Sequence, residues 1–175
     1  QLALRPDLAG RRGSPAGRAE RRAVGAGRQL LEERRDAGRH DGVEHGLPPN
    51  CGYICIYNGR PLIAGNLEDP DSFYWASQDG SEYYPSIFTD YVQGDTNSSI
   101  SGIASGDRFA WIHKTDESFL LTGNLFSGQY NTSQKGDKVG CLAHASIVRS
   151  DRAMIWLGGG AVFESIDGGT PERIS

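Results

Sequence analysis

One pattern occurs three times between residues 51 and 175, and it constrains the fold more than any other feature. Each copy has an apolar run rich in β-branched or aromatic residues, a tight turn, a second apolar run, a loop and a third run. In chain order the runs are 53–57, 61–65 and 72–75, then 103–105, 109–112 and 118–121, then 145–148, 153–157 and 161–163. Runs of this kind, bounded by Asn, Asp, Gly or Ser, predict antiparallel strands joined by tight turns.

The period of the pattern is set by three arginines that close the first turn of each copy, Arg60, Arg108 and Arg152. They lie 48 and 44 residues apart, and a phenylalanine follows 13, 11 and 11 residues later, at Phe73, Phe119 and Phe163. A period in the forties with three or four short strands is typical of β-propeller blades. We therefore expect an all-β fold of antiparallel, blade-like repeats over residues 51–175. Three blades are fewer than a closed ring needs, so this is a partial β-propeller, and the chain is expected to be a fragment of a larger protein.

Residues 1–50 have a different composition. Ala, Arg and Gly supply 25 of these residues, whereas Phe, Tyr, Trp and Ile are absent. Such a segment cannot build a hydrophobic core, so the sequence predicts an arm, 1–50, that is disordered or partly helical. Its ten Arg against seven acidic residues give +3, while residues 51–175 carry eight basic against fifteen acidic residues, or −7. Three interpretations of this segment remain open. It could be a basic arm that touches an acidic partner or DNA, a plain tail, or a sequence translated outside the natural reading frame.

Charge and cysteine content exclude several classes of protein. A net charge of −4 argues against a protein that grips nucleic acid through its phosphates. No run of 18 apolar residues is present, so no membrane association is expected. Three cysteines cannot make a full disulfide framework, which favours a reducing compartment.

The repeated arginines and tryptophans are expected to hold the blades together. Trp75, Trp111 and Trp156 fall in second or third strands, where large side chains fill the space between packed sheets. The arginines are predicted to form surface or inter-blade ion pairs, with convergence on a substrate carboxylate as the alternative. The sequence Ser165–Thr170 approaches the Asp-box turn of sialidase-like propellers, and Ser77–Ser81 is a shorter version; in both, Asp is expected to accept N–H bonds of its own turn and Gly to take positive φ.

No set of residues supports catalysis or metal binding. Glu68, Asp69, Asp71, Asp116 and Glu117 are scattered over turns, and none forms the pair that a glycosidase needs. Four potential zinc ligands, Cys51, Cys55, Cys141 and His144, match no common zinc-site spacing, and buried free cysteines are the preferred interpretation. His113 is expected to be a core histidine, and His40 and His45 to be solvated. The chain is thus predicted not to be an enzyme, with no catalytic, cofactor-binding or metal-binding residue and no small-molecule substrate.

Four segments, which belong to the three repeated units, carry a resemblance to a known family. The segment Arg60–Trp75, with its Gly-Asn-x-x-Asp-Pro turn, resembles the virion β-propellers of tailed bacteriophages, of the packaged-DNA stabilisation and tail nozzle or hub type. Gly106–Gly123, ending in Leu-Thr-Gly, is similar to the next unit of those proteins. Val139–Val148 and the end of the chain at Asp167–Ser175 are similar to a third unit.

The resemblance implies a structural virion component that joins the portal region to the tail and helps to retain packaged DNA. It implies assembly in the bacterial cytoplasm, a final location in the virion, and partners that are other virion proteins or copies of the chain in a ring. Packaged DNA would be only a transiting neighbour. A carbohydrate-binding or sialidase-like propeller domain is the alternative function.

Overall fold

The computed structural model describes residues 39–40, 43–44, 46–136 and 138–175. Its compact β unit runs from Glu44 to Ser175. Most of the predicted arm, 1–38, lies outside the described residues. β1 (Arg39–His40) pairs with β2 (Val43–Glu44), which ends at the first residue of the β unit. Among the described residues, no helix is long and apolar enough to cross a membrane.

The first sheet is a four-stranded antiparallel meander. Its strands, in spatial order, are β3 (Cys51–Tyr57), β4 (Arg60–Asn66), β5 (Ser72–Trp75) and β6 (Thr89–Tyr91). Asn58 and Gly59 make the tight turn between β3 and β4, with φ of 52° and 73°. Both residue types tolerate positive φ, which a two-residue hairpin turn of this hand requires.

The second sheet repeats this arrangement. Its strands are β7 (Ile100–Ser105), β8 (Phe109–Lys114), β9 (Ser118–Asn124) and β10 (Gln129–Gln134). β7 lies beside β3 and β4, so the sheets meet near their first strands. A bulge between Ile100 and Gly102 shifts the register at the start of β7.

The third sheet has the same order but shorter edge strands. Its strands are β11 (Val148–Arg149), β12 (Ala153–Gly158), β13 (Ala161–Ile166) and β14 (Glu172–Arg173). A strand was expected from residue 145, but His144–Ser146 form a short 3₁₀ turn and pairing begins at Val148. The Ser146 hydroxyl donates to the Ala143 carbonyl at 2.7 Å, which stabilises the turn in place of a longer strand.

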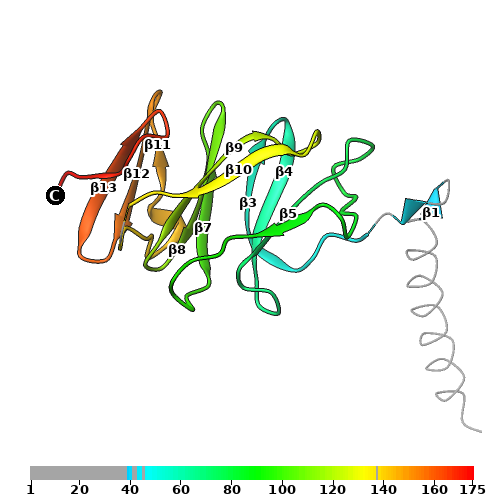
Figure 1. Ribbon diagram of the computed structural model, residues 1–175, viewed down its shortest axis with the longest axis horizontal. Coiled ribbons are helices and arrows are strands. Elements are labelled where there is room, and N and C mark those ends of the chain that lie inside the picture. The colour runs from blue at the N-terminus through cyan, green and yellow to red at the C-terminus, as the bar shows by residue number, and fades with distance from the viewer. Residues whose placement is uncertain (1–38, 41–42, 45, 137) are drawn as a thin grey trace, which may run out of the picture. The chain divides into compact units, whose positions relative to one another are not determined.

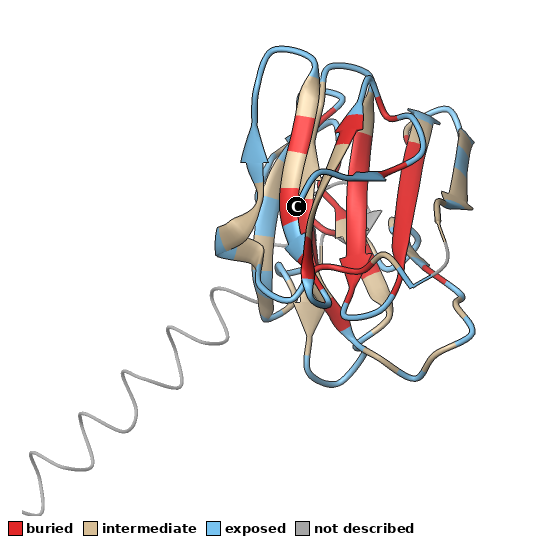
Figure 2. Ribbon diagram, turned by 90° about the vertical axis from the view of Figure 1, so that its left-hand side faces the viewer, coloured by how far each residue is buried: buried red, intermediate tan, exposed pale blue. Residues whose placement is uncertain are grey.

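The three sheets follow one another in chain order, and they do not close into a ring (Figure 1). Most buried residues lie along the strands, and most of the connecting turns are exposed (Figure 2). One core cluster fills the space between the first and second sheets and includes Leu62, Phe73, Trp75, Ile112 and Leu121. A second cluster joins the second and third sheets and includes Trp111, Leu120, Cys141, Met154 and Trp156. The prediction of an all-β fold of three antiparallel units is thereby confirmed.

Candidate functional site

In the described part of the chain, the most specific side-chain contacts are those that join neighbouring sheets. At the first junction, the Tyr57 hydroxyl and the Asn58 side-chain amide both donate to the Gly123 carbonyl, at 2.7 and 3.0 Å. Gly123 has a φ of 95°, and a Cβ there would lie 2.3 Å from the Gln129 carbonyl oxygen. Only glycine therefore presents its carbonyl to the first sheet without strain.

An ion pair between a buried lysine and a partly exposed aspartate crosses the same junction. Lys114 Nζ lies 2.9 Å from an Asp71 carboxylate oxygen, and the Lys114 side chain is only 1% exposed. Beside it, the Pro70 carbonyl accepts a hydrogen bond from the Ile100 N–H at 2.9 Å. The loop after β4 thus binds both the start and the end of the first hairpin of the second sheet.

The buried carboxylate of Glu117 binds the linker between the first and second sheets. It accepts hydrogen bonds from the Asp95 N–H at 2.8 Å and from the Thr96 hydroxyl at 3.1 Å. The Gln134 amide donates to it as well, at 3.3 Å. A buried carboxylate is stable only with such partners, so this network fixes the linker against the β8–β9 turn.

The fourth strands form a further tie across the first junction. The Tyr130 hydroxyl of β10 donates to an Asp90 carboxylate oxygen of β6 at 2.7 Å. Partial burial, with added contributions from the Asp90 carboxylate, raises the pKa of Tyr130 to about 12. The phenol therefore remains a hydrogen-bond donor throughout the neutral pH range.

The second junction is held by the linker Val139–Cys141. The Trp156 indole N–H donates to the Gly140 carbonyl at 3.1 Å, and the Cys141 N–H donates to the Lys114 carbonyl at 2.9 Å. The Ser118 hydroxyl donates to the Val139 carbonyl. A Cβ on Gly140 would lie 2.1 Å from the Thr115 carbonyl oxygen, so the linker and the β8–β9 turn touch at the backbone.

An aromatic cluster fills this junction. The rings of Trp111 and Trp156 have centroids 5.4 Å apart, and His113 lies 4.7 Å from the Trp156 ring. Trp75 belongs to the core between the first and second sheets, where it stacks on Phe88. The prediction that the tryptophans pack between sheets is therefore confirmed.

His113 is a core histidine, as predicted. Its Nδ1 lies 2.7 Å from the Ser118 hydroxyl, and its Nε2 has no hydrogen-bond partner among the described residues. Because Ser118 donates to Val139, its oxygen is free to accept from Nδ1–H. Burial, with a smaller contribution from His144, lowers the pKa of His113 to about 3, so the ring is neutral at physiological pH.

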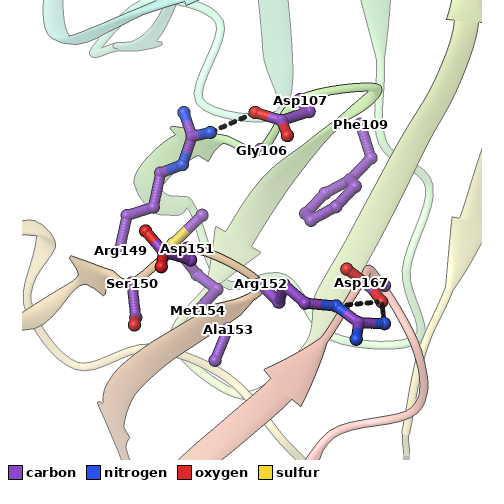
Figure 3. A pocket seen from close by; sticks show the side chains of 10 residues that line it. All are labelled: Gly106, Asp107, Phe109, Arg149, Ser150, Asp151, Arg152, Ala153, Met154 and Asp167. Atoms are coloured by element: carbon purple, nitrogen blue, oxygen red, sulfur yellow. Dashed lines mark hydrogen bonds and ion pairs between the residues drawn. The ribbon is translucent and has the colours of Figure 1, made fainter.

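A small cleft opens at the rim between the second and third sheets. It is lined by the β7–β8 turn, the β11–β12 turn and Asp167 (Figure 3). Its volume is about 30 Å³, which has room for roughly two water molecules. A sugar ring does not fit in such a space.

Two ion pairs occupy this cleft, and only one of them joins two sheets. Arg149 pairs with Asp107 across the second and third sheets, whereas Arg152 pairs with Asp167 within the third sheet (Figure 3). The hydrogen bond from Arg152 is the main cause that lowers the pKa of Asp167, and the charge of Arg108 adds to it. Both guanidinium groups have a protein carboxylate as partner, so neither is free to bind a substrate carboxylate.

The three repeated arginines are not structurally equivalent. Arg60 is the first residue of β4 and donates to the Gln78 carbonyl, whereas Arg108 and Arg152 lie inside turns. The turn of the first hairpin consists of residues 58 and 59, and the corresponding turn positions in the other two hairpins are 107–108 and 151–152. Arg60 therefore corresponds to Phe109 and Ala153, one position later than the sequence spacing suggested.

The Asp-box-like segments differ from their expected geometry. Asp167 and Gly168 both take positive φ, at 52° and 73°, as a tight turn requires. The Asp167 carboxylate, however, pairs with Arg152 instead of capping its own turn. In the other segment, the Asp79 N–H donates to the Ser77 hydroxyl, and Gly80 is not among the positive-φ glycines. The expectation was therefore wrong for Asp79, Gly80 and the carboxylate of Asp167.

The potential zinc ligands do not assemble. Cys51, Cys55 and Cys141 are free, and no cluster of three or more metal-ligating side chains occurs within the described residues. Burial raises the pKa of all three thiols, that of Cys55 to about 12. The structure describes only the backbone of His40, and His45 lies outside the described residues.

Two sheet faces at the ends of the array have no partner sheet in the described chain. We define the first outer face by Ile54, Ile56, Pro61, Ile63 and Tyr74, which point away from the second sheet. We define the third outer face by Val148, Ile155, Leu157, Val162 and Ile166, which point away from the cluster around Trp156. Ile54 is 60% exposed and Leu157 is 43% exposed.

A hollow of about 450 Å³ adjoins the first outer face. Its lining includes Ile54, Pro61, Ile63, Pro49 and Tyr84. Ile63 and Tyr84 are buried beside it, where they pack with Ala76, whereas Ile54 and Ile56 remain 60% and 57% exposed.

Sequence reasoning missed Lys114, which is buried in its pair with Asp71. A weak signal was present, because Lys114 continues an apolar strand without a turn residue before it.

A scan against protein-family models finds no match to this chain, and a search of the curated proteins finds none.

Proposed function

We propose that this chain is a structural component of a tailed-phage virion, built of propeller blades that form part of a ring at the head-to-tail junction or tail hub. In this role the blades supply a rigid wall, and their faces bind neighbouring virion proteins or copies of the chain. Packaged DNA passes by this wall and is retained by it. No catalytic step is involved.

The observation that carries the proposal is the place of the resembling segments. The Gly-Asn-x-x-Asp-Pro loop leads into Pro70 and Asp71, which bind Ile100 and Lys114 of the second sheet. The Leu-Thr-Gly turn supplies the Gly123 carbonyl that the first sheet binds. Each of these segments thus holds one sheet to the next.

The third resembling segment fits the same pattern. Its linker, Val139–Cys141, binds the second sheet through Ser118 and Lys114 and the third sheet through Trp156. A family resemblance whose segments include these inter-sheet contacts supports a role in building an assembly. It gives no support to a role in binding a small molecule.

The acidic β body is consistent with a DNA conduit. Eight basic against fifteen acidic residues give residues 51–175 a charge of −7. A wall with this charge repels phosphates, so DNA can move past it without binding. The carbohydrate alternative gains no support from the rim cleft, which is too small for a sugar and has paired arginines.

The proposal is tested on phage particles released by the bacterium whose DNA encodes the chain. Particles are purified on a density gradient, and peptides from residues 51–175 are quantified by mass spectrometry against the portal protein. We expect a constant ratio to portal protein across the particle peak. Deletion of the gene should yield particles that lose their DNA. Peptides found only in the soluble fraction would contradict the proposal.

A further inference from the structure

All three sheets face the same way along the array. This can be seen by counting residues from the end of the hairpin turn in each sheet. Leu62, Trp111 and Ile155 are each the third residue after the turn of their hairpin, since these turns end at residues 59, 108 and 152. Leu62 packs towards the second sheet, and Trp111 packs towards the third. The side of a sheet that holds this position therefore meets the sheet that follows, and in the third sheet this side carries Ile155.

The neighbouring position has the opposite role. Ile63, Ile112 and Trp156 are each the fourth residue after the turn. Ile112 packs towards the first sheet, and Trp156 packs towards the second. The equivalent side of the first sheet holds Ile63, which packs with Ala76 and Tyr84 of the same unit. The exposed residues of this side, Ile54 and Ile56, lie where a preceding sheet would pack.

The third outer face therefore corresponds to the side that meets a following sheet, and the first outer face to the side that meets a preceding sheet. Together they could form one more junction like the two already present. Their apolar residues also match in position. On the first outer face they lie mainly on β3 and β4, and on the third outer face they lie mainly on β11 and β12. In both sheets these are the first two strands, and at the first junction β7 lies against the corresponding strands β3 and β4. Glu164 and Glu172 lie on the same side of the third sheet, and Glu164 is directly opposite Ile155, so the third outer face also carries acidic side chains on its later strands.

We propose that the third outer face of one copy docks on the first outer face of a second copy, and that two such contacts close a ring of six sheets. The inference rests on the proposed function and specifies how copies meet. A contact between two different faces either closes or continues into a filament. Two copies of three sheets give six sheets, which is within the usual range of about four to eight blades.

The test measures the mass of the full chain by size-exclusion chromatography with light scattering. The wild-type chain should have twice the mass of the 19.0 kDa monomer. Ile54→Lys alters only the first outer face and Leu157→Lys only the third. Each should raise the dimer dissociation constant ~100-fold or more, because the docked face would then hold an unpaired charge. Leu67→Lys, at a 93% exposed loop residue outside both faces, is the matched control and should leave the dimer intact.

Mixing the two variants gives the decisive result. The Leu157→Lys chain keeps an intact first outer face, and the Ile54→Lys chain keeps an intact third outer face. The mixture should therefore recover one contact and form a dimer, although each variant alone is monomeric. This recovery would also show that both variants are folded.

Several outcomes would overturn the inference. These are a wild-type monomer at all concentrations, a dimer that only one of the two substitutions disrupts, no recovery on mixing, or a continuous series of larger species. A wild-type monomer whose peptides still copurify with virions would refute this ring while leaving the proposed function standing. A six-sheet dimer absent from virions would refute the proposed function instead.

Discussion

Asp71 of the first sheet and Lys114 of the second form an ion pair at 2.9 Å in which the lysine is buried and the aspartate is 47% exposed. The two residues are far apart in the sequence, and their contact fixes the β4–β5 loop on the end of β8. Because Lys114 has little access to water, this carboxylate is the partner of its ammonium group within the described residues.

We predict that Asp71→Ala lowers the free energy of unfolding by about 3 kcal/mol, because it leaves the buried ammonium unpaired. The measurement is chemical denaturation followed by circular dichroism. Lys114→Met combined with Asp71→Ala should recover most of the loss, since the double variant buries no charge. Equal stability of the single and double variants would contradict this account.

The exposed pair at the rim cleft should behave differently. Arg149 and Asp107 are 48% and 78% exposed, so water screens their attraction. Arg149→Ala should therefore change the free energy of unfolding by less than about 1 kcal/mol. The same denaturation assay compares it with Asp71→Ala, and a loss as large as that of Asp71→Ala would show that the rim pair also locks the sheets.

Gly140 should be the glycine least tolerant of alanine at the second junction. Its added Cβ would lie 2.1 Å from the Thr115 carbonyl oxygen, and backbone atoms cannot move aside as a flexible side chain can. We expect Gly140→Ala to lower the free energy of unfolding by roughly 2 kcal/mol or more. Gly159→Ala is the matched control, because nothing lies within 4 Å of its Cβ position and its φ is not positive. Similar melting temperatures for the two variants would argue against a tight backbone contact.

His113 should make the chain less stable in acid. Its pKa is about 3 in the folded chain, and it returns towards 6.5 on unfolding. Between these values the unfolded state binds more protons, so the stabilisation is fully present above pH 6.5 and is lost as the pH falls towards 3. Its slope is at most about 1.4 kcal/mol per pH unit. His144 is the titratable neighbour that also acts on this ring.

The pH dependence is measured by thermal melting between pH 4 and 8. His113→Gln removes the titrating group, and it should flatten the dependence even if its overall stability is lower. His144→Gln is the control, and it should keep most of the slope, because burial is the main cause of the low pKa. An unchanged slope in His113→Gln would assign the acid sensitivity to other groups.

The regular hairpins could be predicted from the sequence, and the fourth strands could not. Short continuous apolar runs at Tyr53–Tyr57 and Phe109–Ile112 indicated strands. The run in β8 is apolar throughout because the second sheet packs against a neighbour on each face. The fourth strand Gln129–Gln134 is polar and lies at a sheet edge, so burial leaves little pattern in it. The short β6 has the same disadvantage.

The junctions were hard to predict for a different reason. Whether Gly123 offers its carbonyl to Tyr57 depends on the φ of Gly123 and on how two sheets pack, and a single sequence records neither. The spacing of Arg60, Arg108 and Arg152 was misleading, because similar residues at near-regular intervals need not share a place in the turn. Hydrogen bonding at the turn, rather than residue identity, defines which positions correspond.

The β8–β9 turn receives both linkers of the array, through Glu117 on one side and through Lys114 and Ser118 on the other. The middle sheet can therefore unfold locally only if its contacts with both linkers break. The third sheet, in contrast, has edge strands of only two residues each. Amide hydrogens of β8 and β9 should exchange with solvent last, and those of β11 and β14 first. The chain thus combines a rigid centre with a terminal sheet that can adjust to whatever lies beside it.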